Sequence, residues 1–471
     1  MTDLKQKSFH LVSLGCAKNT VDSESMAQLL RESGYQAVGK PHHAEVLIVN
    51  TCGFIGPAKE ESLEALHALA RRKRPGQILI AAGCLTQRYG REVARQVPGL
   101  DGILGTRRWM DIVEVASQLR ASKHPAPLYH LPEAASVGSV EHDVRRSAVH
   151  GASAYLKIAD GCRRPCAFCA IPLIKGSPVS RPLEAILAEA ADLQRKGVRE
   201  IILIAQDTTD YGHDLGLKDG LAQLLERLPE AAPEVDWLRV MYAYPGYVTD
   251  RLIEVMASQP RVLPYLDMPL QHAHPQTLRR MRRPANLAWV QRTLEKMRLA
   301  MPGLALRTTF IVGYPGETEE EFQTLLDFVR EIRFDRVGAF QFSFEPGTAS
   351  EPLGDPIPPE VKQERWERLM EVQQAISLEN NLSLVGKTLE VLVEGWGEVQ
   401  TKAGNNGRPE HISLGRSYRD APEIDGLVLL AGQAPIGEIV HARIDGGTLY
   451  DLSGTMIENA APEELSLRTL S

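Results

Sequence analysis

Three cysteines stand close together in the stretch Asp160-Gly161-Cys162-Arg163-Arg164-Pro165-Cys166-Ala167-Phe168-Cys169. Their spacing is C-x3-C-x2-C, and no fourth cysteine or nearby histidine completes a set of four. A structural zinc site uses four protein ligands, so these three cysteines fit a closed zinc site poorly. Iron–sulfur clusters are held by cysteine thiolates, usually four, so three would leave one iron open to a cofactor or substrate. The alternative is three buried or disulfide-bonded cysteines without a cofactor.

The other three cysteines, Cys16, Cys52 and Cys84, are far apart in the sequence. Each follows an apolar run that we predict to be a β-strand, and glycines lie beside all three. Because ligands of open parallel sheets bind outside the carboxyl ends of the strands, we expect these cysteines to converge on one edge. The glycines would let the backbone pack closely around a bulky cofactor. We therefore predict a second iron–sulfur cluster, also with an open iron; scattered core cysteines are the alternative.

The pattern of expected strands and helices around these cysteines predicts a multidomain α/β protein. In residues 1–120, four apolar runs alternate with helical segments, which is typical of a parallel sheet covered on both faces. We expect a small doubly wound α/β domain. Its strands are predicted at 9–14, 45–50, 77–82 and 102–104, and its helices at 22–31, 57–70, 88–96 and 109–119. The proline-containing segment 121–151 shows little periodicity and is predicted to be a linker.

Residues 152–378 contain six strand–helix units, which predict a partial (β/α)6 barrel with an open mouth. The strands are expected at 154–158, 200–204, 236–242, 264–268, 304–312 and 336–342. The Cys162 motif follows the first of them, at the carboxyl-terminal face where barrel active sites lie. Polar or glycine-rich loops follow the second, fourth and fifth strands and include Gln206, Gln271 and Gly313. His272 and His274 could ligate a metal, but hydrogen-bonded histidines are commoner.

Residues 380–459 change to short strands with glycine-rich turns, which predict a small antiparallel β-barrel of the OB-like kind. The strands are expected at 388–393, 399–403, 411–414, 437–444 and 448–452. This segment holds six Lys/Arg against eleven Asp/Glu. Phosphate contacts dominate nucleic-acid affinity, so an RNA-binding barrel should be basic, whereas an acidic one fits a basic protein partner. A solvated acidic surface with no partner is the alternative.

Taken together, the chain resembles the methylthiotransferases of the radical S-adenosylmethionine (SAM) superfamily over nearly its whole length, with a TRAM-like final barrel. Two motifs resemble the RimO branch, which acts on small-subunit ribosomal protein twelve: Ser13-Leu14-Gly15-Cys16-Ala17-Lys18-Asn19 and Gln206-Asp207-Thr208-Thr209-Asp210-Tyr211-Gly212. The branch that acts on tRNA adenosine typically has Cys-Gln-Met-Asn and Gln-Asn-Val-Asn at these places. Lys175-Gly176, where many members have Arg-Gly, is a mild variation.

The resemblance implies two [4Fe–4S] clusters and SAM as cofactors. Cys162, Cys166 and Cys169 would hold the cluster that binds SAM and yields a 5′-deoxyadenosyl radical, which abstracts hydrogen from the β-carbon of an aspartate. Cys16, Cys52 and Cys84 would hold the cluster that carries the inserted sulfur, and the methyl group would come from another SAM. The other expected cofactor-binding residues are Phe168, Gln206, Gln271, Val312 and Gly313.

The apolar runs and the net charge of the sequence indicate the expected location and partners. No apolar run could span a bilayer and no secretory signal is visible, so we expect a cytoplasmic protein without membrane contact. A net charge of −7 does not suggest a general nucleic-acid binder. We expect a monomer that acts on a basic ribosomal protein, free or in the assembling small subunit, with a donor such as flavodoxin or ferredoxin. RNA contact is not favoured. The rival interpretations are a tRNA adenosine methylthiotransferase and a non-enzymatic iron–sulfur carrier.

Overall fold

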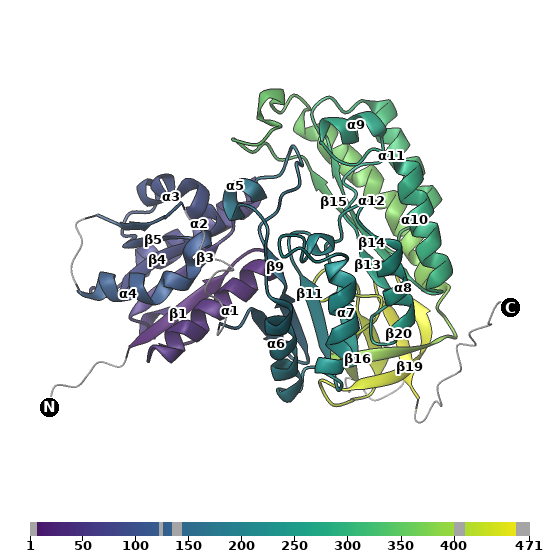
Figure 1. Ribbon diagram of the computed structural model, residues 1–471, viewed down its shortest axis with the longest axis horizontal. Helices are drawn as coiled ribbons and strands as arrows, with labels where there is room; N and C mark the ends of the chain where they lie inside the picture. Colours follow the sequence, from purple (N-terminus) through teal and green to yellow (C-terminus); the bar gives the residue numbers. More distant parts are fainter. Residues whose placement is uncertain (1–6, 122–125, 134–143, 400–409, 458–471) are drawn as a thin grey trace.

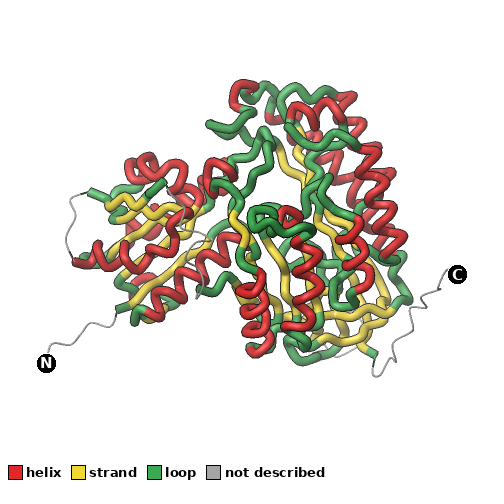
Figure 2. The backbone as a smooth tube through the Cα atoms, viewed as in Figure 1, coloured by secondary structure: helices red, strands yellow, loops and turns green. Residues whose placement is uncertain are grey.

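The computed structural model describes residues 7–121, 126–133, 144–399 and 410–457. The first α/β domain lies to one side, and the central barrel lies on the other side together with the final β-barrel (Figure 1). The tube view shows strands lined by helices in the first two parts and strands alone in the last (Figure 2). Within the described ranges, no helix is both long and apolar enough to cross a membrane.

The first domain is the doubly wound fold that the sequence predicts. Its six parallel strands have the order β2-β1-β3-β4-β5-β6. They are β1 (Ser8–Ser13), β2 (Gln36–Ala37), β3 (Val46–Thr51), β4 (Ile78–Gly83), β5 (Gly102–Gly105) and β6 (Leu128–His130). The helices are α1 (Ala17–Glu32), α2 (Gly56–Arg72), α3 (Cys84–Gln96) and α4 (Ile112–Ala121). Two separate apolar clusters cover the sheet, one under α1 and α4 and the other under α2 and α3.

The segment 121–151, predicted to be a linker, contributes strands to both domains that it joins. β6 pairs in parallel with β5 and completes the first sheet. β7 (Ser147–His150) pairs antiparallel with β8 (Ser153–Lys157), the first strand of the central barrel. Each strand has only three or four residues, which is too short for a periodic pattern to reveal it.

The central domain is a partial barrel of six parallel strands in chain order. They are β8, β11 (Glu200–Ile204), β12 (Trp237–Val240), β13 (Tyr265–Asp267), β14 (Ala305–Val312) and β15 (Arg336–Gln341). A parallel β-bridge between Leu238 and Val262 connects the sheet that contains β12 to the sheet that contains β13. The outer helices are α6 (Leu183–Arg195), α7 (Gly220–Ala231), α8 (Asp250–Ser258), α9 (Pro275–Arg280), α10 (Leu287–Ala300), α11 (Glu319–Ile332) and α12 (Pro359–Leu382). In the described part of the chain, β15 pairs only with β14, which leaves the barrel open as predicted.

The final domain is a closed five-stranded barrel in the order β16-β17-β18-β20-β19. Its strands are β16 (Thr388–Val399), β17 (Glu410–Ser417), β18 (Val428–Ala431), β19 (Ile439–Gly447) and β20 (Leu452–Met456). Neighbouring strands run antiparallel, as predicted, except β18 and β20, which are parallel.

One strand prediction in this barrel is wrong, and another strand is confirmed but is longer than predicted. The predicted strand at 448–452 is mostly a turn, because the Thr448 hydroxyl accepts the backbone N–H of Asp451 and β20 begins only at Leu452. The predicted strand at 388–393 continues to Val399 through a bulge near Gly395, so the predicted break before 399 is absent. The rest of the predicted strand 399–403 lies outside the described residues.

The final barrel covers the amino-terminal end of the central barrel. The carboxylate of Glu200, the first residue of β11, forms a buried ion pair with Arg416 at 2.6 Å. Arg336, the first residue of β15, pairs with Asp420, also at 2.6 Å. Burial raises the pKa of Glu200, but Arg416 and Arg239 outweigh it and lower that pKa to about 2. This end is therefore filled with paired charges, and the carboxyl-terminal end remains available for a site.

Candidate active site

The Cys162 motif lies in a loop between two short paired strands, β9 (Ala159–Asp160) and β10 (Val179–Ser180). The loop also contains α5 (Ile171–Lys175). Gly161 has a φ of +75°, and a Cβ there would lie 2.1 Å from the Ser177 carbonyl oxygen. The next residue, Cys162, donates its N–H to the Gly176 carbonyl at 3.1 Å. Only glycine allows this close approach, which fixes the start of the cysteine loop.

The thiols of this loop are free and suited to a cluster. Burial raises the pKa of Cys162 to about 11 and that of Cys169 to about 12. The Arg283 guanidinium lies 3.5 Å from Cys166 Sγ and offers positive charge to a thiolate. Cluster binding would deprotonate the thiols, as metal binding to cysteine does. Within the described residues, no three His, Cys, Asp or Glu side chains converge closely enough to hold a single metal ion.

The cysteines of the first domain converge at the carboxyl ends of β1, β3 and β4, as predicted. A Cβ on Gly15 would lie 2.8 Å from Cys52 Cβ, and one on Gly53 would lie 2.5 Å from Leu85 Cα, next to Cys84. The three cysteine loops are therefore in direct contact. These glycines allow one loop to pack on another, and their expected role beside a cofactor stays a prediction.

Buried amides hold the Cys16 loop in place. Asn19 donates its side-chain N–H to the Leu14 carbonyl at 2.6 Å, and Asn50 donates to the Asn19 carbonyl at 3.0 Å. Because Asn50 is the penultimate residue of β3 and lies two residues before Cys52, these bonds tie the first cysteine loop to the second. Burial raises the pKa of Cys52 and raises that of Cys84 to about 12, while Cys16 is exposed.

A cavity of about 220 Å³ lies between the first domain and the barrel. The barrel contributes Cys162, Cys166 and Cys169, and the first domain contributes Lys18 and Phe54, each two residues after a cysteine. The other lining residues are Arg164, Phe168, Ile171, Gln206, Tyr242, Ala243, Tyr244, Pro269, Gln271 and Arg283. The barrel cysteines thus line one wall of this cavity, and residues that follow Cys16 and Cys52 line the other.

Three of the five non-cysteine residues expected to bind the cofactor, Phe168, Gln206 and Gln271, line this cavity. Val312 ends β14 and Gly313 follows it, but neither is among the lining residues, and a Cβ on Gly313 would lie 2.4 Å from Lys362 Cγ. The role of all five in binding stays a prediction.

The sequence analysis assigned no role to several residues that line the cavity. Arg283 comes from the segment after α9, and Tyr242 and Tyr244 follow β12. The guanidinium groups of Arg164 and Arg283 lie 4.6 and 4.2 Å from the centroid of the Tyr244 ring. The sequence feature that could have identified Tyr242 and Tyr244 is that they are two aromatic residues at the end of a predicted strand.

Two residues that line the cavity have strained backbones. Tyr242 has a φ of +65° and Gln271 a φ of +75°, in the left-handed region that non-glycine residues rarely adopt. The Tyr242 N–H donates to Asp267 Oδ2 at 3.1 Å, and the Gln271 N–H donates to the Thr309 carbonyl at 2.8 Å. Such strain persists only where the surroundings impose it, and it is concentrated at functional sites.

A buried ion network joins the first domain to the cysteine loop. Asp22 on α1 accepts from Lys157 of β8 and from Lys175 of α5, the latter at 2.7 Å, and Arg146 lies 3.0 Å away. Asp160, next to the cysteine motif, belongs to the same network. Burial raises the pKa of Asp22, but the two lysines outweigh it and hold that pKa below its ordinary value. Lys175 is thus part of the contact between the domains.

A second group of contacts joins the other cysteine-bearing helices to the barrel. Glu345 accepts from Lys59 of α2 at 2.6 Å and from Arg88 of α3 at 2.7 Å. Arg107 donates to the Ile174 carbonyl in α5 at 2.9 Å. All three helices that follow or contain a cysteine are therefore tied to the central domain.

His272, weighed as a metal ligand, uses both ring nitrogens within the protein. Nε2 lies 3.0 Å from Glu317 Oε1, and Nδ1 accepts the N–H of His274 at 2.9 Å. The side chain is fully buried. These contacts favour a structural role.

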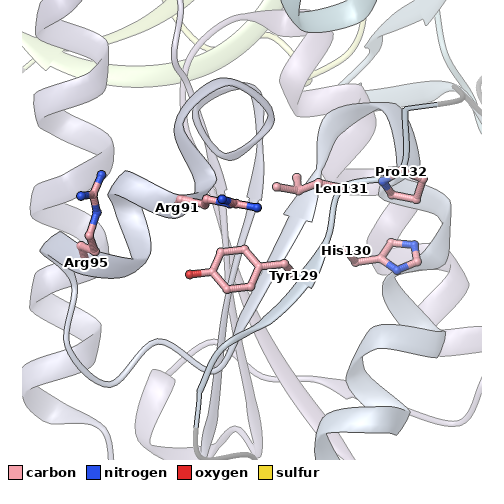
Figure 3. A pocket seen from close by; sticks show the side chains of 6 residues that line it. All are labelled: Arg91, Arg95, Tyr129, His130, Leu131 and Pro132. Carbon is pink, nitrogen blue, oxygen red and sulfur yellow. The ribbon is translucent and has the colours of Figure 1, made fainter.

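A second hollow, of about 920 Å³, lies on the first domain between α3 and the end of β6 (Figure 3). It is lined by Arg91, Arg95, Tyr129, His130, Leu131 and Pro132. No cysteine lines it, so it is separate from the cavity between the domains.

Three family models match the chain. Residues 8–105 match the uncharacterised protein family UPF0004, residues 156–329 the radical SAM superfamily and residues 385–457 the TRAM domain. Among solved structures, the chain resembles the radical SAM methyltransferase TsrM from Kitasatospora setae. The TM-score is 0.56 at 14% identity, over 84% of this chain and 79% of that one. This likeness shows the fold alone.

The similar curated proteins are described as ribosomal protein uS12 methylthiotransferase RimO. The protein from Chloroflexus aurantiacus is 49% identical, over 95% of this chain and 99% of its own length. The one from Roseiflexus sp. (strain RS-1) is 47% identical, over 97% and 99%. The one from Herpetosiphon aurantiacus is 48% identical, over 95% and 100%. The chain therefore belongs to the RimO family of methylthiotransferases, enzymes of the radical SAM superfamily.

Proposed function

We propose that this enzyme inserts a methylthio group at the β-carbon of an aspartate in ribosomal protein uS12. The family supports the reaction and implies SAM and a [4Fe–4S] cluster. The observation that carries the proposal is the cavity between the domains. The three barrel cysteines line one wall, and Lys18 and Phe54, each two residues after a first-domain cysteine, line the other. Hydrogen removal and sulfur delivery would therefore take place close to one another.

The residues divide these tasks between the two domains. Cys162, Cys166 and Cys169 would hold the cluster to which SAM binds, which supplies chemistry able to break an unactivated C–H bond. Cys16, Cys52 and Cys84 would hold a second [4Fe–4S] cluster that carries the sulfur. The proposed SAM contacts are Phe168, Gln206, Gln271, Val312 and Gly313. Arg283, close to Cys166, would offset the charge of the thiolates.

The surface of the final barrel supports a basic protein substrate. Its arginines Arg416 and Arg419 are buried, as are the side chains of Asp420 and Asp425, in contacts with the central domain. The exposed charges that remain among the described residues are mostly acidic: Glu390, Glu394, Glu398, Glu423, Glu438 and Asp445 against Lys387 and Arg443. Such a surface repels RNA and attracts a basic protein.

The form of the substrate, the location, the oligomeric state and the electron donor are also part of the proposal. The substrate would be uS12, free or in the assembling small subunit, and the enzyme would act in the cytoplasm as a monomer. A flavodoxin or ferredoxin would supply the electron. The tRNA alternative is not favoured, because the curated relatives are RimO proteins and the final barrel is acidic.

An anaerobic assay tests the proposal directly. The reconstituted, reduced protein is incubated with SAM, sulfide and a peptide carrying the uS12 aspartate loop. Mass spectrometry should show a gain of about 46 Da, the mass of SCH3 less one hydrogen. If 5′-deoxyadenosine forms but neither the peptide nor full-length uS12 is modified, the substrate assignment is wrong and tRNA is tested next. If no 5′-deoxyadenosine forms, the protein is an iron–sulfur carrier.

A further inference from the structure

Lys18 is a buried basic residue whose side chain forms no ion pair with the residues that the structure describes. Its side chain lines the cavity between the domains, and only 9% of the residue is exposed. Nζ lies 3.2 Å from the centroid of the Tyr242 ring. Within the described residues, Nζ makes no hydrogen bond and no ion pair. The ammonium group is thus held against the face of an aromatic ring and faces the cavity.

The other buried lysines show how unusual this is. Lys157 and Lys175 pair with Asp22 and Asp160, and Lys362 pairs with Asp355. Burying a charge is costly unless it is paired, and a cation–π contact replaces only part of the lost hydration. Among the buried lysines that the structure describes, Lys18 alone lacks a carboxylate.

The nearby carboxylate of Asp267 is already engaged. Its Oδ2 accepts the Tyr242 N–H at 3.1 Å, and its Oδ1 accepts from Arg307 at 2.9 Å. Asp267 therefore fixes the ring on which the ammonium rests but leaves that ammonium free to bind another anion.

We propose that Lys18 binds the side-chain carboxylate of the substrate aspartate. This inference rests on the proposed function and names the group that recognises the substrate. In an aspartate the carboxylate is bonded directly to the β-carbon. An ammonium–carboxylate contact beside Cys16 would therefore hold the reacting carbon in the cavity that the barrel cysteines line. It should also make the enzyme bind aspartate more tightly than the neutral asparagine.

Equilibrium binding tests this contact without turnover. The probes are two labelled uS12-loop peptides, one with the target aspartate and one with asparagine in its place. They are titrated by fluorescence anisotropy into cluster-loaded protein with SAM and no reductant. The proteins are wild type, Lys18→Met and Lys18→Gln, with Lys40→Met as the matched control. Lys40 lies exposed on the surface of the same domain. Iron content and the EPR spectrum are recorded for each protein.

Wild type and Lys40→Met should bind the aspartate peptide at least about tenfold more tightly, as expected for a hydrogen-bonded ion pair. Both Lys18 variants should bind the two peptides alike while keeping the iron and spectrum of wild type. The proposal is wrong if wild type does not discriminate, or if either folded Lys18 variant keeps the preference. Loss of iron with the preference retained would assign Lys18 to the cluster instead.

The two proposals fail separately. The proposed function fails when reduced wild type cleaves SAM but leaves the aspartate peptide and full-length uS12 unmodified. The Lys18 proposal fails if the binding measurements contradict it, whatever the turnover assay shows. If wild type binds neither peptide, the Lys18 proposal is contradicted, and the turnover assay with full-length uS12 still decides the proposed function.

Discussion

The two cysteine sites of this enzyme are built in opposite ways. Cys162, Cys166 and Cys169 lie within one loop between two paired strands, and a single glycine contact fixes its start. Cys16, Cys52 and Cys84 come from three strand ends, and contacts between their loops bring them together. A site within one loop depends mainly on its own residues, whereas a site shared by three strand ends depends on the register of the whole sheet. The two sites should therefore respond differently to substitution.

The largest expected effect separates the chemistry of the two sites. Cys162→Ala should abolish 5′-deoxyadenosine formation, because the proposed SAM-binding cluster would lose one of its three thiolate ligands. Cys16→Ala should keep 5′-deoxyadenosine formation and lose the gain of about 46 Da on the peptide. Chromatography of the nucleoside and mass spectrometry of the peptide check both. Loss of 5′-deoxyadenosine in Cys16→Ala would show that the sites are not independent.

Gly53→Ala should damage the first-domain site alone. The new Cβ would lie 2.5 Å from Leu85 Cα and 2.7 Å from Leu85 N, so the backbone that carries Cys84 must move. Iron analysis should show about half of the iron of wild type, with 5′-deoxyadenosine formation retained. Gly39→Ala, whose Cβ meets nothing within 4 Å, is the matched control and should bind iron normally. Full iron in Gly53→Ala would contradict the proposed second cluster.

Asp22→Asn should weaken the contact between the domains. Removing the negative charge of Asp22 leaves the buried positive charges of Lys157 and Lys175 without one of their anionic partners. Breaking a buried ion pair typically costs about 3–5 kcal/mol of unfolding free energy. Denaturant unfolding of the apo protein measures the loss. The control is Glu379→Gln, which removes an exposed pair with Arg333 and should cost less than about 1 kcal/mol. Equal losses in the two variants would refute the structural role of Asp22.

The smallest expected effect concerns the opposite end of the barrel and its response to pH. The pKa of Glu200 is about 2 in the folded protein, below its ordinary 4.5. Its stabilisation is therefore fully present above about pH 4.5 and is lost as the pH falls towards 2. The difference in unfolding free energy between wild type and Glu200→Gln should shrink by about 3 kcal/mol over this range.

Urea unfolding at several pH values measures that difference. Both cysteine sites should keep their iron in Glu200→Gln at neutral pH, since Glu200 lies at the other end of the barrel. A difference independent of pH would contradict the ion pairs with Arg416 and Arg239.

The same contrast explains what could be predicted from the sequence. The spacing of Cys162, Cys166 and Cys169 is local, so it is visible without a fold. The convergence of Cys16, Cys52 and Cys84 could be predicted because they follow strands of one parallel sheet. Lys18 and Tyr242 are 224 positions apart and meet only because α1 packs against the end of β12, which no periodic pattern shows. Short edge strands such as β6 were missed for the same reason.

The ties between the first domain and the barrel also affect turnover. Asp22, Lys59 and Arg88 anchor three different helices, two of them through Glu345. Swinging the domains apart would break several buried ion pairs in every cycle. These contacts therefore hold the two walls of the cavity at one spacing, and turnover should leave that spacing unchanged.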